Sequence, residues 1–118
     1  MHWFDNEWAI LPTGDVYVLP IDPVIFNYIK LTKIIPVELD LKHVSHKSLV
    51  DKNSIRYLSA NTTYPMIVTE MQNPHNLPYR MIDGQHRIHK LKESQCTTGM
   101  FYIIPESIVL LNLRRVVR

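Results

Sequence analysis

The stretch YRMIDGQHRIHKL (Tyr79–Leu91) decides the fold of this chain. Its first four residues are large and suit a pleated strand, whereas Ile88 and Leu91 recur at helical spacing. Between the two patterns, Asp83 offers a helix-capping side chain, and Gly84 tolerates backbone dihedral angles that other residues avoid. The stretch therefore predicts a strand, a glycine corner and the start of a helix.

The corner Asp83–Arg87 has the chemistry of an anion site. A helix N-terminus leaves backbone N–H groups unpaired and carries a partial positive charge. Acidic residues are favoured there, but this first turn holds His86 and Arg87, which suggests that an external phosphate offsets the charge. Gly84 would let the phosphate approach, the N–H groups of Gln85 and His86 would donate to it, and Arg87 would bind its oxygens.

The other side chains of the corner also have candidate roles. His86 could donate a proton or a hydrogen bond, because imidazole titrates near neutral pH. Asp83 would cap the helix or hold His86 or Arg87 in place. The structural alternative is a capped strand-to-helix turn in which Arg87 pairs with an acidic neighbour.

Composition indicates one ordinary cytoplasmic domain. The 118 residues are 46% hydrophobic and 20% charged, and a single cysteine, Cys96, excludes an internal disulfide. No apolar run is long enough to cross a bilayer, and the start of the chain does not resemble a signal peptide.

Charge is distributed unevenly along the chain. Residues 1–40 hold two lysines against six acids, a net of −4, and residues 41–118 hold eleven Lys or Arg against five acids, a net of +6. This asymmetry suggests either a polyanionic partner for the second part or packing of the acidic front against the basic back.

Residues 1–32 are predicted to be an N-terminal extension of a compact unit. A β-hairpin is expected from Trp8–Leu11 and Val16–Leu19, followed by a helix over Val24–Leu31. The aromatic residues Trp3, Phe4 and Trp8 are expected to cover the core or a subunit contact rather than to bind a ligand.

Residues 33–105 are predicted to be the α+β core of a single domain, a small mixed sheet of about four strands with helices packed on it. The expected strands are Ile34–Leu39 at an edge, Pro65–Thr69 at the centre, Tyr79–Ile82 and Met100–Ile104. The expected helices are Ser54–Ala60, with Ile55 and Leu58 buried, and Gln85–Ser94 on the sheet. Leu41–Ser48 is expected to be a loop or short helix, and the basic segment 106–118 to end as a solvated chain end.

These elements, taken with the Asp-Gly-Gln-His-Arg corner, resemble the ParB N-terminal and sulfiredoxin-like family. Ile34–Val37 resembles the first strand of that family, and Pro65–Thr69 resembles its "P-I-V-V" strand. The resemblance covers roughly residues 33–105 and implies a ParB/sulfiredoxin-like fold. Sulfiredoxin members carry a catalytic cysteine where this chain has Gln85, so their chemistry is not expected.

The resemblance implies a nucleotide triphosphate, carried with Mg²⁺, or another phosphorylated ligand at Asp83, Gly84, Gln85, His86 and Arg87. ParB members bind nucleotide phosphates at this corner, and other relatives are small-molecule kinases or nucleases. Phosphoryl transfer or nucleotide hydrolysis is therefore one expectation. The alternatives are a DNA-binding module or ParB-like nuclease acting on a nucleic-acid backbone, and a non-catalytic interaction protein that has kept the fold and lost the activity. A homo-oligomer is a separate expectation for the partners. No helix-turn-helix region and no membrane partner are expected.

A reaction at the corner would need a general base, and a metal site is a competing idea. Glu38 is the preferred base because kinase-like relatives use a first-strand acid, and His86 is the second candidate; Asp40 and Glu70 also end strands. The pairs His43/His46 and His86/His89 have the spacing of one helical turn, which can hold a metal. No local carboxylate or cysteine completes either pair, so packing or surface histidines are expected.

Overall fold

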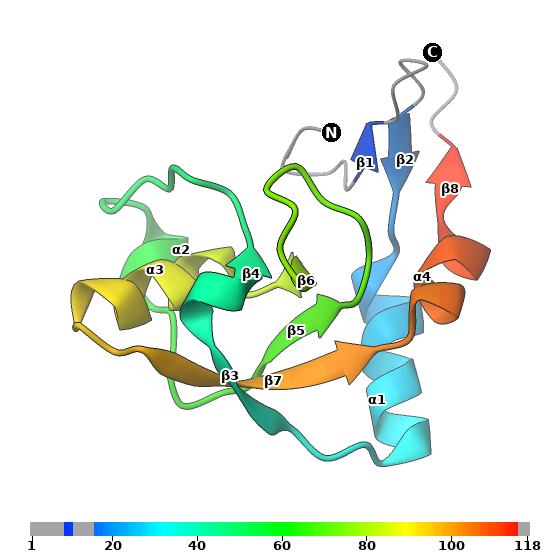
Figure 1. The fold of residues 1–118 in the computed structure, drawn as a ribbon, viewed down its shortest axis with the longest axis horizontal. Helices are drawn as coiled ribbons and strands as arrows, with labels where there is room; N and C mark the ends of the chain where they lie inside the picture. Colours follow the sequence, from blue (N-terminus) through cyan, green and yellow to red (C-terminus); the bar gives the residue numbers. More distant parts are fainter. Residues whose placement is uncertain (1–8, 11–15, 116–118) are drawn as a thin grey trace.

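The computed structural model describes residues 9–10 and 16–115. They form an α+β fold in which a five-stranded mixed sheet curls into a half-barrel, with a three-stranded sheet beside it (Figure 1). The predicted class is thus confirmed, with one strand more than expected in the main sheet. Among the described residues, no helix is long and apolar enough to cross a membrane.

The larger sheet has the strand order β3-β7-β5-β6-β4. The bounds are Val37–Asp40 (β3), Val44–Ser45 (β4), Met66–Thr69 (β5), Tyr79–Asp83 (β6) and Thr98–Ile104 (β7). As predicted, β5 is central; it runs parallel to β7 and antiparallel to β6. β3 pairs antiparallel with β7 at one edge, where Pro36 precedes it. β4, parallel to β6 at the other edge, was not predicted because two residues show no alternation.

Two apolar clusters hold helices on opposite faces of this sheet (Figure 1). One face packs against α3 (Gln85–Glu93), whose Ile88 is fully buried. Its cluster consists of Leu41, Val44, Met66, Val68, Met81, Ile88 and Phe101. The other face packs against a π-helical segment (Ile21–Phe26), which leads into α1 (Asn27–Thr32), and against α4 (Glu106–Asn112). Its cluster consists of Leu19, Ile25, Ile67, Ile82, Ile104 and Val109.

The smaller sheet joins the two ends of the chain. β1 (Ala9–Ile10) and β2 (Val16–Val18) form the predicted antiparallel hairpin, and β8 (Arg114–Arg115) pairs with β2. Within the tail predicted as a solvated chain end, residues 111–118, Arg114 and Arg115 therefore form a strand, although both side chains remain exposed. The turn of the hairpin, the aromatics of residues 1–8 and residues 116–118 lie outside the described part of the chain.

The short helix α2 (Ile55–Leu58) corrects one prediction. Ser54 caps it, because its hydroxyl accepts a hydrogen bond from the Tyr57 N–H at 3.2 Å. Ile55 and Leu58, predicted to be buried, are 82% and 64% exposed, whereas Tyr57 is only 7% exposed. The prediction was wrong because this single turn packs on α3 through Tyr57 and not on the sheet; the Tyr57 hydroxyl donates to the Glu93 carboxylate.

Candidate functional site at the start of helix α3

The corner is formed where β6 ends at Asp83 and α3 begins at Gln85. Gly84 between them has φ of +121°, a backbone conformation that side chains with a Cβ rarely adopt. A Cβ at Gly84 would also lie 2.5 Å from Cγ of Met66. Glycine is therefore required here for backbone conformation and for close packing on β5, whether or not a ligand approaches it.

The first turn of α3 is electropositive. Gly84 is the N-cap residue, no side chain caps the helix, and the first turn holds no acidic residue. The Ile88 N–H donates to the Gly84 carbonyl at 2.9 Å, which is the first bond of the helical ladder. In any α-helix, the N–H groups that precede this bond have no partner within the helix. Partial positive charge from the helix dipole adds to the charge of Arg87, which is paired with Asp83, and the His86 imidazole lies in the same turn.

Asp83 and Arg87 form an ion pair across one turn. Nη2 of Arg87 lies 2.9 Å from Oδ2 of Asp83, and the Arg87 side chain is only 17% exposed. Of the roles expected for Asp83, the structure shows the second: its carboxylate holds Arg87 in place and does not cap the helix, as in the structural alternative in which Arg87 pairs with an acidic neighbour. The guanidinium also donates to the Pro65 carbonyl at 2.8 Å and to the Tyr64 carbonyl at 3.5 Å. Its first role in the structure is therefore to hold the chain that enters β5.

Gln85 and His89 bind the peptide groups around Lys47. The Lys47 N–H donates to Oε1 of Gln85 at 2.8 Å. The Lys47 carbonyl accepts from Nε2 of His89 and from Nδ1 of His46, both at 2.8 Å. Gln85 and His89 are four residues apart and so share one face of α3. Neither contact was predicted, since a partner 38 or 42 residues away leaves no local pattern.

The two histidine pairs predicted from spacing do not form separate sites. The structure instead brings one member of each together: the rings of His46 and His89 are 5.1 Å apart in an edge-to-face arrangement. Nζ of Lys92 donates to Nε2 of His46 at 2.8 Å. Among the described residues, no group of three or more His, Cys, Asp or Glu side chains is placed to hold a metal.

Burial is the largest cause that lowers the pKa of His46, from 6.5 to about 4. The hydrogen bond to the Lys47 carbonyl opposes this shift, whereas electrostatic interactions with Lys92, His89 and His75 add to it. The imidazole is thus neutral at pH 7, donates from Nδ1 and accepts at Nε2. This small polar cluster stabilises the turn and is not built to hold an anion directly.

The pKa of His46 predicts a loss of stability on mild acidification. Between pH 6.5 and pH 4 the unfolded chain binds a proton that folded His46 does not, so stability present above pH 6.5 falls as the pH falls. We expect a loss of about 1–2 kcal/mol between pH 7 and pH 5, after allowing for the partial exposure of the ring. Urea unfolding at the two pH values measures it.

A pair of asparagine variants separates this effect from other titrations. His46→Asn keeps a donor near the Lys47 carbonyl but cannot titrate, and it should remove most of the pH dependence. The control, His43→Asn, changes an exposed histidine and should leave the dependence intact. Equal slopes in both variants and the parent would contradict the assignment to His46.

The structure does not bring the candidate acid Glu38 to the corner. β3, which carries Glu38, lies three strands away from β6, roughly 14 Å along the sheet. The neighbours of Glu38 in β3, Val37 and Leu39, pair with Phe101 and Gly99, and these two residues lie on the face of the sheet that packs against α3. Side chains alternate between the two faces along a strand, so Glu38 lies on the face away from α3.

Asp40 and Glu70 also have other surroundings. Asp40 accepts from the Lys42 N–H at 3.0 Å, and this bond is the largest cause that lowers the pKa of its carboxyl. Glu70 follows β5 and lines a shallow pocket at the opposite end of β6 from the corner. Neither Asp40 nor Glu70 is therefore placed to act as a general base for a ligand at the start of α3.

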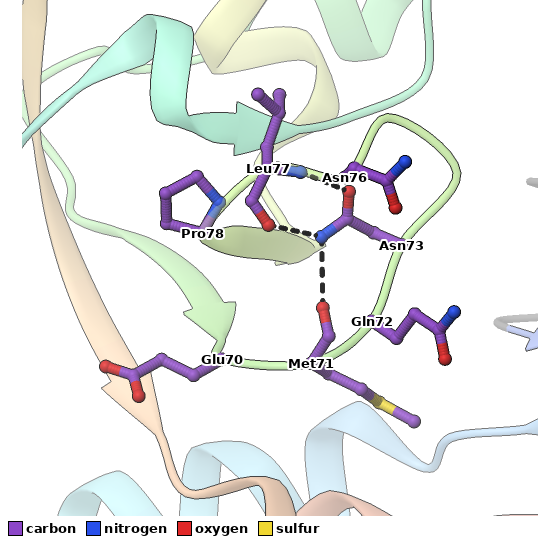
Figure 2. A pocket seen from close by; sticks show the side chains of 7 residues that line it. All are labelled: Glu70, Met71, Gln72, Asn73, Asn76, Leu77 and Pro78. Atoms are coloured by element: carbon purple, nitrogen blue, oxygen red, sulfur yellow. Dashed lines mark hydrogen bonds between the residues drawn. The ribbon is translucent and has the colours of Figure 1, made fainter.

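That pocket has a volume of about 360 Å³ and is formed by the loop between β5 and β6 (Figure 2). Its lining residues are Glu70, Met71, Gln72, Asn73, Asn76, Leu77 and Pro78. Asn73 is 4% exposed and organises the loop: its amide donates to the Met71 and Leu77 carbonyls and accepts from the His75 and Leu77 N–H groups. The pocket therefore has a rigid frame, but its lining does not include the corner residues.

No protein family, characterised protein or solved structure matches this chain in comparisons of its sequence and fold. The function of the corner is accordingly argued from its own geometry. Of its five residues, Gln85 and Arg87 bind neighbouring segments of the chain, and Asp83 binds Arg87.

Proposed function

We propose that this chain is a ParB/sulfiredoxin-like domain that binds a phosphorylated ligand, by preference a nucleotide, at the corner Asp83–Arg87. The observation that carries the proposal is the uncapped start of α3. Gly84 begins the helix with no side-chain cap and no acid in the first turn, and two cations or potential cations occupy that turn. Such a helix end lowers the free energy of a bound anion through its N–H groups and its dipole.

Each corner residue would make a different contact with a bound phosphate. The N–H groups of Gln85 and His86 would donate to phosphoryl oxygens, and the His86 imidazole would add a further donor. Arg87, held by Asp83, would contribute positive charge and a second hydrogen-bonding group. A magnesium ion would arrive with the phosphates of a nucleotide.

If the site is catalytic, phosphoryl transfer or hydrolysis is the class of reaction that this charge supports. Positive groups fixed at the corner would stabilise the phosphoryl oxygens, and His86 is the acid–base candidate that lies there. Sulfiredoxin chemistry is not proposed. Gln85 occupies the position of the thiol, and exposed Cys96 lies past the other end of α3, more than about 13 Å along the helix.

A thermal-shift panel of ATP, CTP, GTP and their diphosphates with Mg²⁺ tests the proposal. A ligand held only by the native state raises the melting temperature, by several degrees at about 100 times its dissociation constant. His86→Glu is the sharpest variant, because an acid in the first turn suits the helix dipole but repels phosphate. We expect this variant to fold and to lose the ligand-induced shift.

Gln95→Glu is the matched control. It adds one negative charge at an exposed position beyond the other end of α3, and it should keep the shift. A shift that survives in His86→Glu, or no shift with any nucleotide at millimolar concentration, would refute the proposal. Stabilisation by duplex DNA alone would instead favour the nucleic-acid alternative.

A further inference from the structure

Residues 46–65, here called the strap, cross the outer side of α3 and are held there mainly by side chains of that helix. Arg87 donates to carbonyls at the end of the strap, and Lys90 donates to the Leu58 and Ala60 carbonyls at 2.9 and 3.2 Å. The Glu93 carboxylate accepts from Tyr57 and Lys52. The helix residues that form hydrogen bonds or ion pairs with the strap are Gln85, Arg87, His89, Lys90, Lys92 and Glu93.

The strap buries little apolar surface of its own. Tyr57 is the one buried residue within residues 46–65, whereas Leu49, Ile55, Leu58 and Tyr64 are 64–82% exposed. The ion pair between Lys52 and Glu93 is itself exposed, with side chains 57% and 44% accessible. Segments held by few apolar contacts and by solvent-exposed polar bonds open at lower free energy than the core.

Arg87 belongs to both the strap contact and the corner. It lies in the first turn of α3, where an anion would bind, and the same guanidinium fastens the strap at Pro65 and Tyr64. Nη2 of this guanidinium is held by the Asp83 carboxylate, so a phosphate at the corner would compete for Nη1, which donates to two neutral carbonyls. An anionic acceptor binds guanidinium more strongly than a neutral one.

We propose that anion binding at the corner is coupled to release of the strap through Arg87. This inference rests on the proposed function, since it describes the regulation of the same site. The bound anion draws the guanidinium away from the Pro65 and Tyr64 carbonyls, and the end of the strap loosens. Coupling between two equilibria is reciprocal, so loosening the strap by another route strengthens anion binding.

Lys90→Ala provides that other route. It removes two hydrogen bonds to the strap, both on the α2 side, and touches none of the corner residues. We expect it to raise the affinity for MgATP or inorganic pyrophosphate by about threefold to tenfold. Lys30→Ala, which removes an exposed lysine on α1, is the charge-matched control and should leave the affinity unchanged.

Calorimetric titration with MgATP and with pyrophosphate, together with hydrogen exchange of the strap amides, tests the coupling. Faster exchange within residues 46–65 on ligand binding, with tighter binding by Lys90→Ala, supports it. Binding with unchanged strap exchange and equal affinity in Lys90→Ala overturns the coupling and leaves the proposed function standing. Absence of binding by the parent and by Lys90→Ala overturns both.

Discussion

Replacing Gly84 with alanine is expected to lower the free energy of unfolding by about 3–5 kcal/mol, from two costs that add. The first is backbone strain, because φ of +121° is unfavourable for any residue with a Cβ. The second is overlap with Met66, whose Cγ and Cβ would lie 2.5 and 2.9 Å from the new atom. Met66 is 1% exposed and surrounded by core, so it has little room to move. Urea unfolding measures the loss.

Gly99→Ala is the matched control for this prediction. The new Cβ would also meet Met66, at 2.9 Å from Cε, and Leu41, at 3.1 Å from Cδ2. These atoms are the ends of flexible side chains, and Gly99 does not have the unusual φ of Gly84. We expect a smaller loss of about 1–2 kcal/mol. Equal losses for the two variants would show that backbone conformation at the corner contributes nothing.

Asn73→Ala is expected to destabilise the fold by about 2–4 kcal/mol. The side chain is 4% exposed and makes four hydrogen bonds to backbone groups of its own loop. Figure 2 shows those to Met71 and Leu77. Alanine removes all four and leaves carbonyl and N–H groups of the loop without these partners. Thermal or urea unfolding measures the change in stability. We also expect the loop that forms the pocket to lose its fixed conformation in this variant.

Two further variants separate the parts of this effect. Asn73→Asp keeps the acceptor for the His75 and Leu77 N–H groups but loses the donors to Met71 and Leu77, so an intermediate loss is expected. Gln72→Ala, at an exposed position in the same loop, should change stability by less than about 0.5 kcal/mol. A loss for Gln72→Ala equal to that for Asn73→Ala would contradict the hydrogen-bonding explanation.

Local patterns were sufficient to place most elements. The strand–glycine–helix corner was predicted because large strand residues, a glycine and helical apolar spacing follow one another directly in the chain. The central position of β5 was predicted because Met66–Thr69 is a continuous apolar and β-branched run, and it is buried at all four positions. These features depend on neighbours in sequence, so they can be read without the fold.

The wrong and missing predictions share one cause: each depends on a contact between segments that are distant in the sequence. Ile55 and Leu58 were assigned to the core from their spacing, but α2 packs on another helix through Tyr57. β4 and β8 are too short to show a pattern and exist because distant strands pair with them. Glu38 was grouped with the corner as a strand-end acid, and only the strand order separates the two.

For the corner, the sequence by itself determined that a helix begins after Gly84 with His86 and Arg87 in its first turn, because backbone preference and helical spacing are local properties. Tertiary structure decided what those side chains touch. The pair of Asp83 with Arg87 spans one helical turn and is local, but Gln85 and Arg87 also bind a strap 20 to 40 residues earlier in the chain. Such partners are set by how strands pair and helices pack, since those contacts bring together residues that have no relation along the chain.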